Sequence, residues 1–237
     1  MAEATKADRA TVVLVHGAFA DASSWNGVIT RVLAKGVPVM APANPLRGIA
    51  ADSAYMAAVF AQVDGPVIAV GHSYGGAVIT NAATEAKNVV GLVYVAAFAP
   101  DERETLGVAS AASKDSILNS ALVPRQYPGP DGKSATEFYI DPAKARDAFA
   151  RDLSDEQAAL IAATQRPIAE AAFSEPNGPP AWKGLPSWAV VATADNAAGT
   201  DVVRSMAERA GATVTELDGS HVIMVSQPEA VTDGQPH

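Results

Sequence analysis

The feature that most constrains this chain is the segment Gly-His-Ser-Tyr-Gly-Gly at residues 71–76. A continuous apolar run at residues 67–70 leads into it, and a helix pattern at residues 77–83 follows it. A Gly-x-Ser-x-Gly turn between a strand and a helix holds its serine in a strained conformation, with the hydroxyl exposed above the sheet. Glycine is expected two residues before and two after Ser73, because the tight turn leaves no room for a Cβ atom. The segment therefore predicts a nucleophile elbow at Ser73.

Short apolar runs alternate with helix patterns on both sides of this turn. Strands that read as continuous apolar runs are covered on both faces, and their alternation with helices is typical of a parallel sheet between two layers of helices. The sequence therefore predicts an α/β fold. The expected strands are residues 11–15, 37–41, 67–70, 89–95, 188–192 and 213–217; the expected helices include one from Ser23 or Ser24 to Lys35, one at 53–63 and one at 202–210.

The alternation stops between about residues 101 and 181. Residues 122–127 and 136–140 are candidates for a hairpin, while Asp141-Pro142 and a capping box at Ser154 are typical helix starts. A stretch of this length is too long for an unstructured loop in a compact domain. We therefore expect three parts: a polar leader at residues 1–10, an α/β core at 11–100 and 182–237, and an inserted, mostly helical cap at 101–181.

Composition excludes several classes of function. The net charge of -9 argues against nucleic acid or an anionic membrane as a partner. The chain has no cysteine, which excludes disulfides, thiolate metal sites and a thiol nucleophile. Residues 1–9 lack the apolar stretch of a signal peptide, and the longest apolar run, residues 89–99, is too short to span a bilayer. We expect a cytoplasmic protein; a homodimer is left open.

A serine hydroxyl needs a base before it can act as a nucleophile, and the four histidines of the chain allow a choice by elimination. His16 ends the first predicted strand, His72 lies inside the elbow, and His237 is the terminal residue. His221 lies in a loop after the last strand, and side chains there reach the carboxyl edge of the sheet, where ligands bind in α/β proteins. His221 is therefore the predicted base.

The base in turn needs a carboxylate that holds its tautomer and stabilises the imidazolium. Asp195 directly follows the predicted strand 188–192, which places it at the same edge of the sheet. Two alternatives stay open: Asp201 lies near a helix start, and Asp218 is close to His221 in sequence. The favoured order is serine, then aspartate, then histidine along the chain, as in α/β-hydrolases.

The oxyanion of an acyl-transfer reaction requires two backbone N–H donors. One is expected from Tyr74, the residue after the nucleophile. The other is expected from the loop His-Gly-Ala-Phe at residues 16–19, with Ala18 favoured and Phe19 as the alternative.

Together these motifs resemble the α/β-hydrolase superfamily, and most closely its small capped esterases, a group that also contains methyl-salicylate-type esterases and hydroxynitrile lyases. The resemblance covers about residues 11–232 and includes Ser220-His221 and Gln227-Pro228. It implies a triad of Ser73, Asp195 and His221 with neither a metal nor an organic cofactor. Lyases of this group carry lysine and threonine where this chain has Val222 and Ala18, which argues against lyase chemistry. Cofactor-free haloperoxidases usually carry methionine where this chain has Tyr74.

The expected function is hydrolysis of small apolar carboxylic esters, or lactones, through an acyl-enzyme. Two alternatives are a non-hydrolytic receptor for a small apolar ligand on the same fold, and a cofactor-free haloperoxidase or perhydrolase. Eight aromatic residues are available for an apolar pocket beneath the cap. The predicted lining is Phe19, Phe98, Phe138 and Phe173, and the other four aromatic residues are Tyr74, Tyr139, Phe149 and Trp182.

Overall fold

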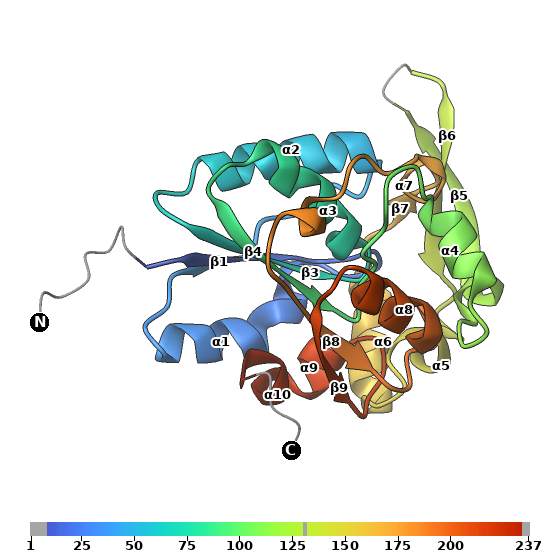
Figure 1. Cartoon of the computed structure of the whole chain (residues 1–237). Helices are drawn as coiled ribbons and strands as arrows, with labels where there is room; N and C mark the ends of the chain where they lie inside the picture. Colours follow the sequence, from blue (N-terminus) through green and yellow to red (C-terminus); the bar gives the residue numbers. More distant parts are fainter. Residues whose placement is uncertain (1–8, 130–131, 234–237) are drawn as a thin grey trace, which may run out of the picture.

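The computed structural model describes residues 9–129 and 132–233, so most of the predicted leader and the terminal His237 lie outside the described residues. At the centre lies a six-stranded sheet in which all neighbouring strands run parallel (Figure 1). The predicted α/β fold is therefore confirmed. In their order across the sheet the strands are β2 (Val39–Met40), β1 (Thr11–Val15), β3 (Val67–His72), β4 (Val89–Val95), β8 (Ser187–Ala192) and β9 (Thr213–Leu217).

The continuous apolar runs located the strands because a parallel sheet is covered on both faces. β1, β4 and β9 have the predicted bounds. β2 is shorter than the predicted strand at 37–41, because the N–H of Val37 donates to the carbonyl of Val32 at 3.2 Å and so belongs to the turn that ends α1 (Asn26–Ala34).

Helices cover both faces of the sheet (Figure 1). On one face α2 (Ile49–Ala61) packs against α3 (Tyr74–Glu85), and on the other α1 contacts α9 (Ile223–Ser226) and α10 (Pro228–Asp233). α8 (Thr200–Arg209) packs against β8 and β9. The core between these layers contains fully buried Trp25, Met56, Phe60 and Leu92. Burial of each such side chain contributes about 1.5–3 kcal/mol to stability.

Two helix starts differ from the prediction because a nearby aspartate organises the preceding backbone. A 3-10 helix, η2 (Ala22–Trp25), precedes α1, and its cap is Asp21, whose carboxylate accepts the N–H of Ser23 at 2.8 Å. α2 begins at Ile49 rather than at Ser53. Its start is held by Asp52, whose carboxylate accepts the backbone N–H of Arg47 at 3.0 Å.

The segment at residues 101–181 has its own small antiparallel sheet, which lies beside the central sheet (Figure 1). Backbone hydrogen bonds join this segment to the loops after β1, β2 and β8, through Phe19, Leu46 and Asn196. It therefore lies over the carboxyl edge of the central strands. Its elements are α4 (Leu106–Ala112), η3 (Leu118–Ala121), β5 (Leu122–Pro128), β6 (Ser134–Ile140), α5 (Ala145–Phe149), α6 (Asp155–Thr164), β7 (Ile168–Ala169) and α7 (Ala171–Ser174), followed by η4 (Ala181–Lys183).

Local sequence signals in this segment gave two confirmed elements and one wrong helix start. The predicted hairpin is confirmed as β5 paired with β6, and Ser154 and Gln157 form the predicted capping box of α6. The helix start predicted at Asp141 is wrong. The carboxylate of Asp141 accepts the N–H of Ala143 at 3.0 Å and forms a turn, and α5 begins only at Ala145.

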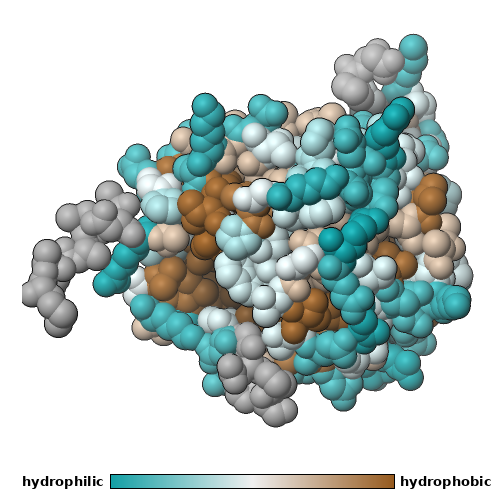
Figure 2. Space-filling view, in the orientation of Figure 1, coloured by the Kyte–Doolittle hydropathy of each residue, from teal (hydrophilic) through white to brown (hydrophobic). Residues whose placement is uncertain are grey.

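Figure 2 shows several separate apolar patches among hydrophilic residues on the visible face of the molecule. Large exposed apolar side chains include Leu33, Val108 and Leu160, which lie on three different helices. Scattered residues of this kind are normal for a globular domain. Within the described residues, none of the helices combines the length and apolar character needed to cross a bilayer.

Candidate active site

Ser73 lies at the sharp junction between β3 and α3, with φ 54° and ψ -124°. A positive φ is strained for serine and persists only where the surrounding structure holds it. A Cβ atom at Gly71 would lie 2.5 Å from the carbonyl oxygen of Gly75, so these two glycines meet as expected. Gly75 has a second reason to lack a side chain, because a Cβ there would lie 2.3 Å from the carbonyl oxygen of Val15. The elbow is therefore pressed against the end of β1.

Replacing Gly75 with alanine should lower the free energy of unfolding by about 3 kcal/mol, because the obstructing atoms are the backbone of β1 and cannot rotate away. The displacement should also disturb residues 16–18 and reduce the reactivity of Ser73. Urea denaturation measures the first effect. Gly184→Ala is the control, because its nearest non-local atom would be 4.0 Å away. Equal stability of the two variants would contradict the packing described here.

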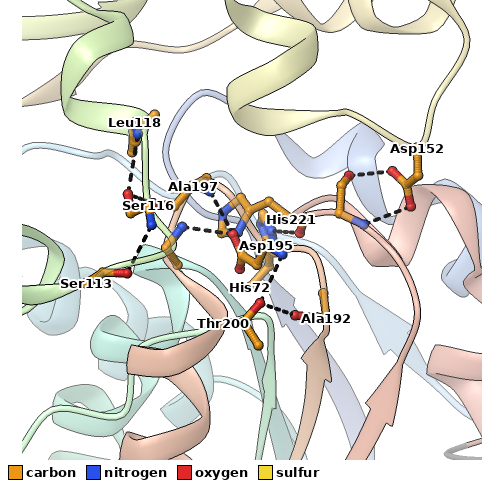
Figure 3. Close-up of polar contacts among 12 residues, drawn as sticks. His72, Ser113, Ser116, Leu118, Asp152, Ala192, Asp195, Ala197, Thr200 and His221 are labelled. Atoms are coloured by element: carbon orange, nitrogen blue, oxygen red, sulfur yellow. Dashed lines mark hydrogen bonds and ion pairs between the residues drawn. The ribbon is translucent and has the colours of Figure 1, made fainter.

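The structure brings His221 and Asp195 together in a buried contact. Nδ1 of His221 lies 2.8 Å from Oδ2 of Asp195 (Figure 3). The other carboxylate oxygen, Oδ1, accepts the N–H groups of Ala197 and Ala198 at 2.9 Å each. Because a carboxylate accepts, His221 carries its proton on Nδ1, which leaves Nε2 as an acceptor. This is the tautomer that a general base requires.

The two alternative carboxylates have other partners. Asp201 accepts hydrogen bonds from the hydroxyl of Ser113 at 2.5 Å and from the N–H of Lys114 at 2.9 Å. Asp218 accepts from the hydroxyl of Thr193 at 3.2 Å. Of the three candidate aspartates, Asp195 is therefore the one that the fold delivers to His221.

The elbow and the His221 loop are joined by His72. Nε2–H of His72 donates to the carbonyl oxygen of His221 at 3.0 Å, and the two ring centroids are 4.6 Å apart. In the described part of the chain, the bond to Asp195 is the one hydrogen bond of the His221 ring, so its Nε2 is not bonded to Ser73 in this structure. Catalytic hydrogen bonds are often long in substrate-free sites and shorten only when substrate binds.

The other two described histidines are buried and bond to neighbouring loops, although Nδ1 of His72 has no hydrogen-bond partner among the described residues. Burial lowers the pKa of His16 and holds the pKa of His72 well below its ordinary value. His16 donates from Nδ1 to the carbonyl of Gly17 at 2.9 Å and accepts the N–H of Asn44 at Nε2, also at 2.9 Å. These bonds fix the loop at residues 16–19.

That loop lies directly against Ser73, since a Cβ atom at Gly17 would be 2.6 Å from the Cβ atom of Ser73. The N–H of Phe19 already donates to the carbonyl of Arg166 at 3.0 Å, which removes it as an oxyanion donor. Among the described residues, the N–H groups of Ala18 and Tyr74 have no hydrogen-bond acceptor. Tyr74 also opens helix α3, and a helix N-terminus favours negative charge.

Comparison with known proteins identifies the family of this chain. The model of the alpha/beta hydrolase family matches residues 12–233. The chain belongs to this family. No curated protein sequence matches it significantly.

Solved structures of other α/β hydrolases share the fold over nearly the whole chain. Polyneuridine aldehyde esterase has a TM-score of 0.80 and 20% identity, covering 96% of this chain and 98% of its own. The pyrethroid hydrolase of Sphingobium faniae JZ-2 has a TM-score of 0.75, 20% identity and 95% coverage of both chains. Tomato methylketone synthase I, solved with 2-tridecanone, has a TM-score of 0.74 and 22% identity, covering 95% of this chain and 96% of its own.

The four predicted pocket residues of this α/β hydrolase fall into two pairs. Phe19 and Phe98 are buried beside the elbow, and the N–H of Phe98 donates to the carbonyl of Ser73 at 3.2 Å. Phe138 and Phe173 contact each other with ring centroids 6.2 Å apart. They line a hollow of about 420 Å³ between α4, β5, β6 and α7, and no candidate triad residue lines it.

Phe149 is an aromatic residue that the structure places against His221. Its ring centroid is 5.0 Å from that of His221 and 6.0 Å from that of Phe19. It also lines a cavity of about 140 Å³ together with Phe19 and Val222. The sequence offered Phe149 as one of eight aromatics but contained no local signal for this contact, because α5 and the His221 loop are far apart in the chain.

Tyr74 does not contribute its ring to a pocket. The ring is buried, and its hydroxyl donates to Asp52 of α2 at 2.7 Å. Burial raises the pKa of the Asp52 carboxyl, although hydrogen bonds from Tyr74 and the N–H of Arg47 oppose this rise. Asp52 therefore holds Tyr74 in place through its hydroxyl, a role that sequence reasoning missed. Among residues 9–129 and 132–233, no group of three or more histidine, aspartate or glutamate side chains could hold a metal ion.

Proposed function

We propose that this α/β hydrolase is a serine hydrolase that cleaves small apolar carboxylic esters or lactones through an acyl-enzyme. The observation that carries the proposal is the buried His221–Asp195 pair, joined through His72 to the strained turn at Ser73. A histidine held in this tautomer near a serine on a strained strand-to-helix turn is the arrangement that activates a hydroxyl nucleophile.

In this mechanism Nε2 of His221 takes the proton of Ser73 as Oγ forms a bond to the substrate carbonyl carbon. The N–H groups of Ala18 and Tyr74 donate to the developing oxyanion, and donors of this kind are worth about 3 kcal/mol each. The bond from carbon to the alcohol oxygen then breaks, and His221 returns its proton to the leaving alkoxide. Water, deprotonated by His221, next attacks the acyl carbon, the bond from this carbon to Oγ of Ser73 breaks, and His221 returns the proton to Oγ as the acid is released.

An apolar ester is supported by the rings of Phe19, Phe98 and Phe149 around the elbow and the base. Two of the structural neighbours carry the names esterase and pyrethroid hydrolase. Methylketone synthase I has the same fold under a different name, so fold alone does not decide the reaction. The proposal therefore depends on the geometry around Ser73.

A fluorophosphonate probe and a series of p-nitrophenyl esters test this proposal. The native protein should be labelled by the probe at Ser73, identified by peptide mass spectrometry, and should hydrolyse at least one ester between acetate and dodecanoate or a simple lactone. Heat-unfolded protein is the control for non-specific labelling. A folded protein that is not labelled, and that binds an apolar ligand without turnover, would be a receptor instead of a hydrolase.

A further inference from the structure

The loop that carries His221 is held from the segment at residues 101–181 by one carboxylate. Asp152, between α5 and α6, accepts the N–H of Ser220 at Oδ2 at 3.0 Å and the hydroxyl of Ser220 at Oδ1 (Figure 3). Ser220 immediately precedes His221 and is buried. Both hydrogen bonds to the carboxylate are charge-assisted, and their two-point geometry fixes orientation as well as distance.

The close approach of this loop to Asp152 is built into the backbone. A Cβ atom at Gly219 would lie 2.8 Å from Oδ2 of Asp152 and 2.3 Å from Cδ1 of Ile223. Glycine at this position therefore allows the peptide N–H of Ser220 to reach the carboxylate. Without Asp152, the buried donors of Ser220 would have no partner, which favours movement of the loop.

The same segment also contacts the loop of Asp195. The N–H of Ile117 donates to the carbonyl of Asn196 at 2.9 Å, and the hydroxyl of Ser116 donates to the carbonyl of Ala197 at 2.6 Å. Figure 3 shows Ser116 on one side of the His221–Asp195 pair and Asp152 on the other. Both members of the pair therefore have their backbone held by residues of the predicted cap.

We propose that Asp152 is a positioning residue of this site: it fixes the backbone before His221 so that the imidazole meets Ser73 and Asp195 at the same time. This inference rests on the proposed function. It assigns the predicted cap a part in the alignment of the base, in addition to covering the site. A misplacement of about 1 Å in a catalytic group costs about 100-fold in rate, so loss of this contact should affect turnover more than binding.

The variants Asp152→Ala and Asp152→Asn test the proposal against Glu156→Gln as a matched control. Glu156 is an exposed carboxylate at the start of α6, in the same segment. We expect Asp152→Ala to lower kcat for the best p-nitrophenyl ester by about 30-fold with less than about 3-fold change in KM. Asp152→Asn keeps one acceptor oxygen and should lie between Asp152→Ala and the native protein, and Glu156→Gln should match the native protein.

A second measurement does not depend on turnover. The Nδ1 proton of His221, identified in the proton NMR spectrum by its absence in His221→Ala, should broaden or disappear in Asp152→Ala and Asp152→Asn but persist in Glu156→Gln. A lower melting temperature with unchanged kcat and an unchanged Nδ1 resonance would show a merely structural role and overturn the proposal. A native protein that fails to react with the fluorophosphonate probe would overturn the proposed function instead, and the resonance would still decide the role of Asp152.

Discussion

Replacing Ser73 with alanine should lower kcat/KM for p-nitrophenyl esters by about 10⁴-fold or more. In the proposed mechanism Oγ of Ser73 forms the acyl-enzyme, and the remaining N–H donors would support only a small residual rate. The fold should be little affected, because among the described residues the hydroxyl of Ser73 makes no hydrogen bond that the substitution would break. Steady-state kinetics and urea denaturation of the same preparation measure both quantities.

The control for this substitution is Ser120→Ala, which removes an exposed hydroxyl on η3. The double variant Ser73→Ala/His221→Ala should be no slower than Ser73→Ala alone, because groups that act as one unit are strongly non-additive. Independent, multiplicative losses in the double variant would mean that His221 does not act through Ser73. Retention of most activity in Ser73→Ala would refute the proposed mechanism.

Replacing Asp195 with asparagine should lower kcat by about 10⁴-fold, the scale seen when a triad aspartate becomes asparagine. The reason is that the N–H groups of Ala197 and Ala198 both donate to Oδ1 and therefore require an acceptor oxygen at that position. They hold the amide oxygen of the new side chain, so its NH₂ group faces His221. An NH₂ donor forces the imidazole to accept at Nδ1 and to carry its proton on Nε2, where it cannot receive the proton of Ser73.

Asp201→Asn and Asp218→Asn serve as matched controls for this prediction. Both remove one negative charge near the site, and neither carboxylate contacts His221. Each should retain kcat within about 3-fold of the native value, because neither carboxylate is bonded to His221 or to Asp195. A large loss of kcat in either control, with little loss in Asp195→Asn, would mean that a carboxylate other than Asp195 supports His221.

How far the sequence determined this protein differs between local and distant features. The turn at Ser73 was predictable because the glycines on each side of Ser73 and the apolar run before it are close neighbours in the sequence. β1 and β4 were predictable in their bounds because a strand covered on both faces gives a nearly continuous apolar run. The start of α2 was not, because Asp52 bonds to backbone that precedes the helix.

Contacts between distant segments could not be predicted from any local pattern. The sequence favoured Asp195 among three aspartates because it directly follows a strand, but only the folded chain shows that Asp195 contacts His221. It likewise gave no sign that Phe149 packs on His221, that Asp52 anchors Tyr74 or that Asp152 holds Ser220. The order of apolar runs and glycines determined the sheet and the strained serine, because those depend on neighbours in the chain. The tertiary structure alone decided the contacts that hold Tyr74 and the His221 loop in place, because hydrogen bonds between distant segments depend on where folding places them in space.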